Sequence, residues 1–179
     1  SSTCAIFGEP EMVPMNEDLP KRPVSPYGTT KLIIEHALAD YSAAYGIGYA
    51  ALRYFNAAGA SADGDLGEDH NPESHLIPIV LQVALGQRDK ITVFGEDYPT
   101  PDGTYIRDYV HVDDLASAHV LALGHLLDTA GGSFIANCGY GHGYSVREGL
   151  DAVAAAAGRP VPATLRPRRA GDPPRLGAA

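Results

Sequence analysis

The stretch Ser25-Pro26-Tyr27-Gly28-Thr29-Thr30-Lys31 predicts the start of a helix that carries a tyrosine and a lysine one turn apart. Ser25 is a favoured N-cap, because its hydroxyl accepts a hydrogen bond from an unpaired first-turn amide. Pro26 suits the first helical position, where a missing N–H costs nothing. Tyr27 and Lys31 then share one face, and both the lysine charge and the positive end of the helix dipole favour the phenolate. Such a tyrosine is suited to proton transfer near neutral pH, although Tyr-x-x-x-Lys is short and also occurs on ordinary amphipathic helices.

Strand and helix patterns alternate along the 179 residues and predict an α/β fold with parallel strand pairing. The helix from Pro26 ends at Gly46, and we expect its apolar stripe to comprise Leu32, Ile33, His36, Ala37 and Tyr41. Ser145 and Glu148 have the spacing of a capping box for a helix that reaches Ala157. The other predicted helices cover residues 76–86 and 113–127, and the predicted strands cover residues 1–7, 48–55, 91–94, 105–110, 133–137 and 163–166.

Composition and charge narrow the class of protein. A net charge of −9 argues against nucleic-acid binding. No apolar run is long enough to span a membrane, no secretory leader is visible, and the two solitary cysteines fit a reducing cytoplasm. Cys4 and Cys138 are expected to be buried small side chains rather than a disulfide or metal pair, and the histidines show no metal-ligand spacing, so no metal site is predicted.

The late arginines form either a solvated face or a site for a compact anion such as a diphosphate: Arg159, Arg166, Arg168, Arg169 and Arg175.

Four further segments, taken with the stretch around Tyr27, resemble the extended short-chain dehydrogenase/reductase superfamily. They are residues 1–8 (SSTCAIFG), 52–60 (LRYFNAAGA), 106–114 (IRDYVHVDD) and 168–172 (RRAGD). The Arg-Tyr-Phe-Asn segment and the segment at residues 95–104 (GEDYPTPDGT) are typical of a smaller group within that superfamily. They resemble the UDP-glucose 4-epimerases of the NAD-dependent epimerase/dehydratase family, and the resemblance runs over nearly the whole chain.

This resemblance implies the C-terminal part of a Rossmann-like doubly wound parallel sheet, together with a smaller α/β substrate-binding domain. Residues 1–60 would be the remaining part of the NAD-binding domain. Residues 61–179 would mainly bind the UDP-sugar, with segments around 105–137 returning to the Rossmann domain. No Gly-x-x-Gly-x-x-Gly loop follows a strand. The N-terminal dinucleotide-binding half is therefore expected to be absent, and the chain to be a fragment without activity of its own.

In the family, bound NAD takes a hydride from sugar C4 while a tyrosine takes the proton of the 4-hydroxyl. The transient 4-keto sugar turns over, and hydride returns to the opposite face. The resemblance thus implies interconversion of UDP-glucose and UDP-galactose in galactose metabolism, by a homodimer paired partly through the tyrosine-bearing helix. It makes Tyr27 the general base and then the general acid, and it makes Lys31 the ligand of the nicotinamide ribose. Thr3 would bond the reacting oxygen, or would simply be a strand-end threonine bonded to backbone.

The same resemblance assigns binding residues. Phe55 would lie at the cofactor, although it is equally suited to the core. Arg107 and Arg169 would bind the diphosphate. The remaining expected substrate contacts are Asn56 at the diphosphate, Asp172 at a ribose hydroxyl, Thr92, Val93 and Phe94 beside uracil, and His75 with Leu76. His75 stands where the epimerases often have asparagine. Leu176 stands where members that exclude N-acetylated sugars have a bulky aromatic residue, which predicts tolerance of UDP-N-acetyl-sugars.

Three alternatives stay open from the sequence. A nucleotide-sugar 4,6-dehydratase would need an Asp-Glu pair directly after the strand-end hydroxyl, and Cys4 and Ala5 at those positions cannot transfer a proton in that role. The chain as it stands could be a non-catalytic piece that retains UDP-sugar contacts. A plain oxidoreductase would release reduced cofactor, which an epimerase does not.

Overall fold

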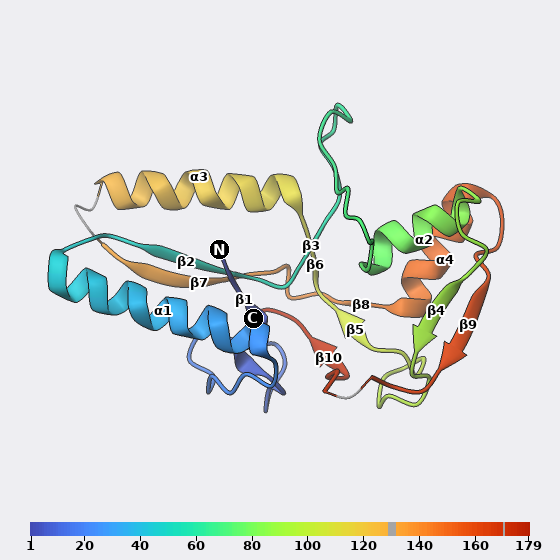
Figure 1. Ribbon diagram of the computed structural model, residues 1–179, viewed down its shortest axis with the longest axis horizontal. Helices are drawn as coiled ribbons and strands as arrows, with labels where there is room; N and C mark the ends of the chain where they lie inside the picture. The colour runs from blue at the N-terminus through green and yellow to red at the C-terminus, as the bar shows by residue number, and fades with distance from the viewer. Residues whose placement is uncertain (129–131, 170) are drawn as a thin grey trace. The chain divides into compact units, whose positions relative to one another are not determined.

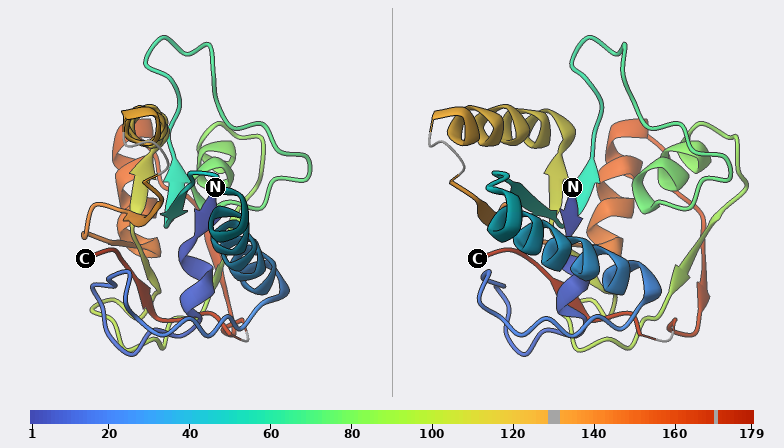
Figure 2. Two further views of the ribbon diagram at one scale, coloured as in Figure 1. Left: turned by 90° about the vertical axis from the view of Figure 1, so that its left-hand side faces the viewer. Right: turned by 60° about the vertical axis from the view of Figure 1, so that its left-hand side comes forward.

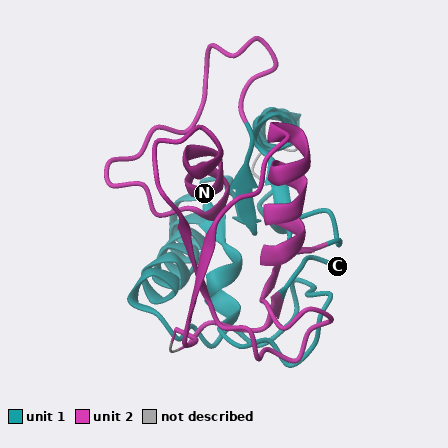
Figure 3. Ribbon diagram, turned by 90° about the vertical axis from the view of Figure 1, so that its right-hand side faces the viewer, with its two compact units in different colours: residues 1–59, 108–142, 176–179 teal, residues 60–107, 143–175 magenta. Residues whose placement is uncertain are grey.

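The structure is a computed structural model that describes residues 1–128, 132–169 and 171–179. It divides into two compact units, which Figure 3 colours separately. Unit 1 comprises residues 1–59, 108–142 and 176–179, and unit 2 comprises residues 60–107 and 143–175. Each unit is thus assembled from segments that lie far apart in the sequence.

Unit 1 is built on a parallel sheet of three short strands. These are β1 (Ser2–Thr3), β2 (Ala50–Tyr54) and β7 (Phe134–Cys138), in the order β1-β2-β7. Helices α1 (Pro26–Tyr45) and α3 (Val112–Asp128) lie on opposite sides of β2 and β7 (Figure 1). A second parallel pair, β3 (Asn56–Ala58) with β6 (Tyr109–His111), follows β2. Parallel strands covered by helices on both sides confirm the predicted doubly wound α/β class.

The predicted strand over residues 1–7 is wrong beyond Thr3. The chain instead forms a 3-10 helix, η1 (Cys4–Phe7), and Thr3 is its N-cap. The Thr3 hydroxyl accepts a hydrogen bond from the Ala5 N–H at 3.2 Å, so a local polar contact replaces further strand pairing. Ile6 and Phe7 of η1 are buried in the core of unit 1 together with Met15, Phe55 and Ala178.

Helix α1 confirms the predicted caps but not the predicted apolar stripe. The Ser25 hydroxyl accepts from the Gly28 N–H at 3.1 Å, Pro26 is the first residue, and Gly46 ends the helix in the left-handed conformation. The expected stripe is largely exposed, since Ile33, His36, Ala37 and Tyr41 all face solvent. The buried positions of α1 are Gly28 and Glu35, on the side that contacts β1 and η1 (Figure 2).

Glu35 is buried because it has a partner. Its carboxylate accepts two hydrogen bonds from Arg53, at 2.9 Å from Nε and 2.7 Å from Nη2, and one from the Ser2 hydroxyl at 2.5 Å. The two charged side chains are 5% and 1% exposed. A polar triad between β1, α1 and β2 thus stands where the periodicity of α1 predicts an apolar contact.

Unit 2 contains a parallel strand pair and two helices. Strand β4 (Ile91–Phe94) pairs with β9 (Ala163–Arg166), and α2 (Leu76–Ala84) packs on α4 (Val146–Ala157). The buried core consists of Val80, Val83 and Ile91, with Leu150 and Val153 of α4 against it. Ser145 and Glu148 form the predicted capping box. β5 (Ile106–Arg107) pairs antiparallel with β8 (Tyr144–Ser145), and β10 (Arg175–Leu176) leads the chain back into unit 1.

The predicted strand over residues 105–110 is interrupted at Asp108, where the chain enters unit 1. Asp108 is fully buried, and its carboxylate accepts from the backbone N–H groups of Tyr140 and Gly141 at 3.0 Å and of Ala178 at 3.1 Å. This residue therefore joins the segments 108–142 and 176–179 of unit 1 by hydrogen bonds. Among the described residues, no helix is both long enough and apolar enough to cross a membrane.

Candidate active site

Tyr27 and Lys31 lie one turn apart on α1, as their spacing predicts. The Lys31 ammonium nitrogen lies 5.8 Å from the centre of the Tyr27 ring. It also donates to two oxygens of Ser1, the carbonyl oxygen at 3.0 Å and the hydroxyl oxygen at 3.3 Å. Tyr27 is 56% exposed, so a ligand can reach its side chain. The lysine thus places positive charge beside the phenol and can bind two neighbouring oxygen atoms at once.

The absence of a side chain at Gly28 lets the first turn of α1, which carries this pair, lie close to η1. A Cβ at position 28 would lie 2.5 Å from the Ala5 carbonyl oxygen and 3.0 Å from Cβ of Pro23. Neither neighbour is the end of a flexible side chain, so only glycine lets the first turn of α1 lie against η1 at this distance. The motif Tyr-x-x-x-Lys does not reveal this requirement, because the contact comes from a distant segment.

Thr3 lies at the end of β1 and caps η1, so the backbone-bonded alternative for this residue is realised. In that contact its oxygen acts as the acceptor for Ala5, which leaves the hydroxyl proton as a donor for another group. Thr3 is nevertheless buried at 7% exposure. The predicted bond to a reacting oxygen remains a prediction that this geometry permits.

Tyr54 and His119 form a contact that the sequence does not predict. The Tyr54 hydroxyl lies 2.6 Å from His119 Nε2, and His119 Nδ1 lies 2.7 Å from the Leu115 carbonyl oxygen. A carbonyl only accepts, so in the neutral ring Nδ1 carries the proton and Nε2 accepts from the tyrosine. Burial raises the pKa of Tyr54 above its usual value, which keeps its hydroxyl as the donor.

Phe55 and Asn56 follow β2 directly. The Phe55 side chain is buried in the core of unit 1 with Phe7 and Met15, so it has a packing role. The Asn56 backbone N–H donates to the Asp108 carbonyl oxygen at 3.0 Å, within the β3–β6 region. Any ligand contact of Asn56 must then come from its side-chain amide. The predicted cofactor contact of Phe55 and diphosphate contact of Asn56 stay predictions.

Arg107, Arg169 and Asp172 come together in unit 2. Asp172 Oδ1 accepts from Arg107 Nη2 at 2.7 Å, and Asp172 Oδ2 accepts from Arg169 Nη2 at 3.1 Å. The carboxylate therefore holds two guanidinium groups side by side. The Arg107 side chain is almost completely buried and also donates to the Ile106 and Pro173 carbonyl oxygens, at 2.9 Å each, whereas the Arg169 side chain is half exposed.

Aromatic rings line these guanidinium groups. The Arg107 guanidinium carbon lies 4.4 Å from the centre of the Tyr105 ring, and that of Arg169 lies 5.0 Å from the centre of the Phe94 ring. Burial raises the pKa of Tyr105, so this phenol stays neutral beside the arginines. Residue 170, inside the Arg-Arg-x-Gly-Asp segment, lies outside the described residues.

The other predicted contacts of unit 2 lie on β4 and at the start of α2. Thr92 is exposed, Val93 is buried, and Phe94 is half-buried toward Arg169. Within the described part of the chain, β4 pairs with one strand only, so its other edge offers backbone groups to a ligand. Leu76 packs its side chain into the core of unit 2 and opens α2, where the first backbone N–H groups have no helical partner. His75 is the N-cap residue of α2.

Leu176 belongs to β10 and packs partly buried against the core of unit 1. Its side chain is therefore held by Phe7, Met15 and their neighbours. The predicted effect of a small side chain here on sugar selectivity stays a prediction.

A capped helix that presents an exposed tyrosine and, one turn later, a half-buried lysine beside a parallel sheet is the arrangement of the short-chain dehydrogenase/reductase class. Within that class, the chain belongs to the NAD dependent epimerase/dehydratase family, whose family model matches residues 1–139.

Individual relatives and solved structures show which members of this family the chain is similar to. A UDP-glucose 4-epimerase of Halalkalibacterium halodurans is 55% identical over 177 residues, which are 98% of this chain and 52% of that relative. The crystal structure of UDP-glucose 4-epimerase from Brucella ovis in complex with NAD is 55% identical, with a TM-score of 0.94 over 99% of this chain and 55% of that one. The enzyme from Bifidobacterium longum in complex with NAD+ and UDP is 43% identical, with a TM-score of 0.93 over 100% of this chain and 54% of that one. The chain spans about half the length of the curated relatives it matches.

Proposed function

We propose that the full-length protein containing this chain is an isomerase that inverts C4 of a UDP-hexose, interconverting UDP-glucose and UDP-galactose. The observation that carries the proposal is the exposed Tyr27 with the Lys31 ammonium 5.8 Å from its ring centre on a capped helix. The similarity to named UDP-glucose 4-epimerases over 98% of the chain supports the choice of reaction within the family.

Tyr27 is the acid–base group of this proposal. Its phenolate accepts the proton of the sugar 4-hydroxyl and later returns a proton to the same oxygen. The positive charge of Lys31 and the N-terminal end of α1 both stabilise the phenolate relative to the phenol. Thr3 retains a hydroxyl proton that it can donate to the reacting oxygen, which holds the substrate in position while the proton moves.

The residues of unit 1 fit the nicotinamide end of NAD, the cofactor that structures of similar enzymes contain. The Lys31 ammonium already binds two neighbouring oxygens of Ser1, one carbonyl and one hydroxyl, and both accept a hydrogen bond as the two hydroxyls of a ribose would. Tyr27 and Lys31 would hold that ribose, with Phe55 beside the cofactor. When bound, NAD supplies the hydride acceptor and donor that inversion at a carbinol carbon requires.

Unit 2 is the proposed UDP-binding part. Arg169 is half exposed and has a fork of donors suited to phosphate oxygens, while Arg107 and Asp172 fix its position. Asp172 retains acceptor capacity for a ribose hydroxyl beyond its two arginine contacts. The backbone N–H of Leu76 at the start of α2 suits an anion, whereas His75 offers only its side chain, because its backbone N–H donates to Glu73 Oε1 at 2.7 Å. The open edge of β4 at Thr92, Val93 and Phe94 suits the hydrogen-bonding edge of uracil.

The assembly and the location belong to the same proposal. Ile33, Tyr41 and Tyr45 are large apolar side chains exposed on α1, which supports a homodimer paired through this helix. No disulfide joins Cys4 to Cys138, in agreement with a reducing compartment such as the cytoplasm.

The experiment is to supply the full-length protein with UDP-galactose and NAD+ and to follow the sugar products and the absorbance of reduced cofactor. We expect UDP-glucose to form without stoichiometric growth of that absorbance. Accumulating reduced cofactor would indicate an oxidoreductase, and a 4-keto-6-deoxy sugar would indicate a dehydratase.

The isolated chain is predicted to be inactive, so UDP-glucose formed by it would contradict that prediction. UDP-N-acetylglucosamine tests Leu176, because turnover is expected and its absence would exclude the predicted tolerance.

A further inference from the structure

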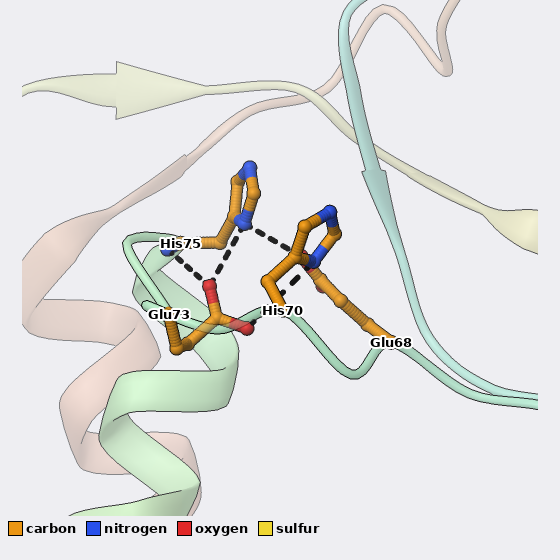
Figure 4. A group of neighbouring side chains, drawn as sticks. All are labelled: Glu68, His70, Glu73 and His75. Carbon is orange, nitrogen blue, oxygen red and sulfur yellow. Dashed lines mark hydrogen bonds and ion pairs between the residues drawn. The ribbon is translucent and has the colours of Figure 1, made fainter.

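Four side chains just before α2 converge on one point in unit 2. Figure 4 shows both imidazoles turned toward the carboxylates of the same loop. Nδ1 of His75 lies 2.6 Å from Oε1 of Glu68 and 2.9 Å from Oε1 of Glu73. Nδ1 of His70 lies 3.0 Å from Oε1 of Glu68 and 3.9 Å from Oε2 of Glu73. One nitrogen or oxygen atom from each of the four residues lies within 4.8 Å of all the others.

These separations suit a common metal ion. Zinc takes histidine nitrogen and carboxylate oxygen at roughly 2.0–2.2 Å in a tetrahedron, whose ligand atoms are then about 3.4 Å apart. The histidine–carboxylate pairs lie between 2.6 and 3.9 Å apart, on both sides of that value, and all four donor atoms lie within 4.8 Å of one another. An ion at the centre therefore requires the donor atoms to change their separations by at most about 1.4 Å. The spacing Glu-x-His-x-x-Glu-x-His resembles no metal motif, so only the folded loop reveals the donor set.

One of the four donors is held rigidly before any ion binds. The Glu73 side chain is 4% exposed, and Oε1 accepts from the backbone N–H groups of Ser74 at 2.6 Å and His75 at 2.7 Å. A carboxylate fixed by backbone donors keeps its second oxygen, Oε2, directed to a ligand. The two imidazoles are half exposed, which leaves a path for an ion to enter.

The surrounding charge also favours a cation. Residues 60–87 contain no lysine or arginine, and their five carboxylates are Asp63, Asp65, Glu68, Asp69 and Glu73. In the absence of a metal, both Nδ1 atoms must carry protons to bond the same Glu68 oxygen, and the two ring centres are only 4.9 Å apart. A divalent ion replaces both protons and satisfies the same oxygens.

We propose that Glu68, His70, Glu73 and His75 form a binding site for one divalent transition-metal ion of the Zn²⁺ type. Both imidazoles bind through Nδ1 as neutral rings, so each gives up its Nδ1 proton when the ion enters. The ion then joins the loop before α2 to the N-cap residue of that helix. The four donors include neither Tyr27 nor Lys31, and they share only His75 with the proposed UDP contacts.

The test is zinc titration of the purified, tag-free full chain after metal removal, by calorimetry and by the visible spectrum of the Co²⁺ form. We expect one Zn²⁺ per chain, and ligand-field bands typical of tetrahedral Co²⁺ with nitrogen and oxygen donors. His70→Gln and Glu68→Gln should each lower zinc affinity by at least about 100-fold. Asp69→Asn is the matched control, because it removes one charge from the same loop but no donor, and its affinity should change by less than about threefold.

Two results would overturn the metal site. One is a folded wild-type chain, judged by circular dichroism, that binds no stoichiometric zinc. The other is an equal loss of affinity in Asp69→Asn and Glu68→Gln, which would mean that zinc responds to diffuse charge alone. If a variant does not fold, the zinc stoichiometry and the Co²⁺ spectrum of the wild-type chain still show whether the metal site exists. Zinc binding is measured directly, so a failure of the proposed UDP-hexose activity has no bearing on it.

Discussion

The candidate site residues of unit 1 and those of unit 2 are brought together in different ways. In unit 1, Tyr27 and Lys31 are four residues apart on one helix, and the cap at Ser25 precedes them directly. In unit 2, Arg107 and Asp172 are 65 residues apart and meet only through tertiary structure. Local helix geometry therefore places the Tyr27–Lys31 pair, whereas tertiary structure assembles the arginine–aspartate cluster around the buried Arg107 side chain. Substitutions should accordingly affect turnover at the unit 1 pair and ligand affinity at the unit 2 cluster.

The largest expected effect is on turnover. Tyr27→Phe removes the proposed acid–base hydroxyl and should lower kcat of the full-length protein by roughly 10²–10⁴-fold, with little change in UDP affinity. Steady-state kinetics with UDP-galactose measure the first quantity and UDP titration the second. Tyr41→Phe is the matched control, since it removes a hydroxyl from another exposed tyrosine of α1. Equal losses in both variants would contradict a catalytic role for Tyr27.

The buried pair of unit 1 should dominate stability. Glu35→Gln leaves the Arg53 guanidinium buried without a counter-charge, which should reduce the free energy of unfolding by about 3–5 kcal/mol. Urea denaturation measures this change. Asp40→Asn, an exposed position on the same helix, should change the stability by less than about 0.5 kcal/mol.

The same pair predicts a pH dependence. Burial alone raises the pKa of Glu35, but the hydrogen bonds from Arg53 and Ser2 more than offset it, so the pKa lies below its ordinary value of 4.5. The stabilisation is therefore fully present above pH 4.5 and is lost as the pH falls through the folded-state pKa. Between about pH 7 and pH 3 the wild-type chain should lose more stability than Glu35→Gln. If the free energy of unfolding falls equally with pH in the two proteins, Glu35 does not cause the pH dependence.

In unit 2 the expected effect is on affinity. Arg169→Ala removes the exposed fork and should weaken UDP binding by roughly 10–100-fold, the range for a hydrogen bond to a charged group. Calorimetry at low and high salt is the measurement, and high salt should reduce the difference. Arg168→Ala is the control, because this neighbouring arginine pairs with Asp97 and stacks on Tyr98 instead. A greater loss of UDP affinity in Arg168→Ala would indicate that Arg168, and not Arg169, binds the phosphate.

The smallest of these effects tests the packing of the helix turn that carries Tyr27 against η1. Gly28→Ala forces a methyl group against the Ala5 carbonyl oxygen and should destabilise the protein by about 1–3 kcal/mol. Gly149→Ala in α4 is the control, because a Cβ there meets no atom within 4 Å and alanine favours a helix. If both glycines tolerate alanine equally, the close approach of α1 to η1 is not required for stability.

Local chemistry explains which parts of the fold were predictable. The Ser25 cap, the Gly46 end, the Ser145–Glu148 capping box and β4 all depend on residues within a few positions of one another. The errors have tertiary causes. Glu35 replaces the apolar stripe of α1 because Arg53 and Ser2 satisfy its charge, and the strand over 105–110 is interrupted because Asp108 turns inward to bind three backbone amides.

The same division holds for the candidate sites. The sequence by itself determined the tyrosine–lysine pair, because a helix repeats every 3.6 residues and brings i and i+4 together wherever it forms. It also determined the parallel α/β class through the alternation of strand and helix patterns. Only the tertiary structure decided that Asp172 joins two arginines and that Tyr54 meets His119. The same holds for the two glutamates and two histidines that gather before α2. Those contacts depend on where distant segments or a folded loop bring the side chains, and residue spacing carries no information about that distance.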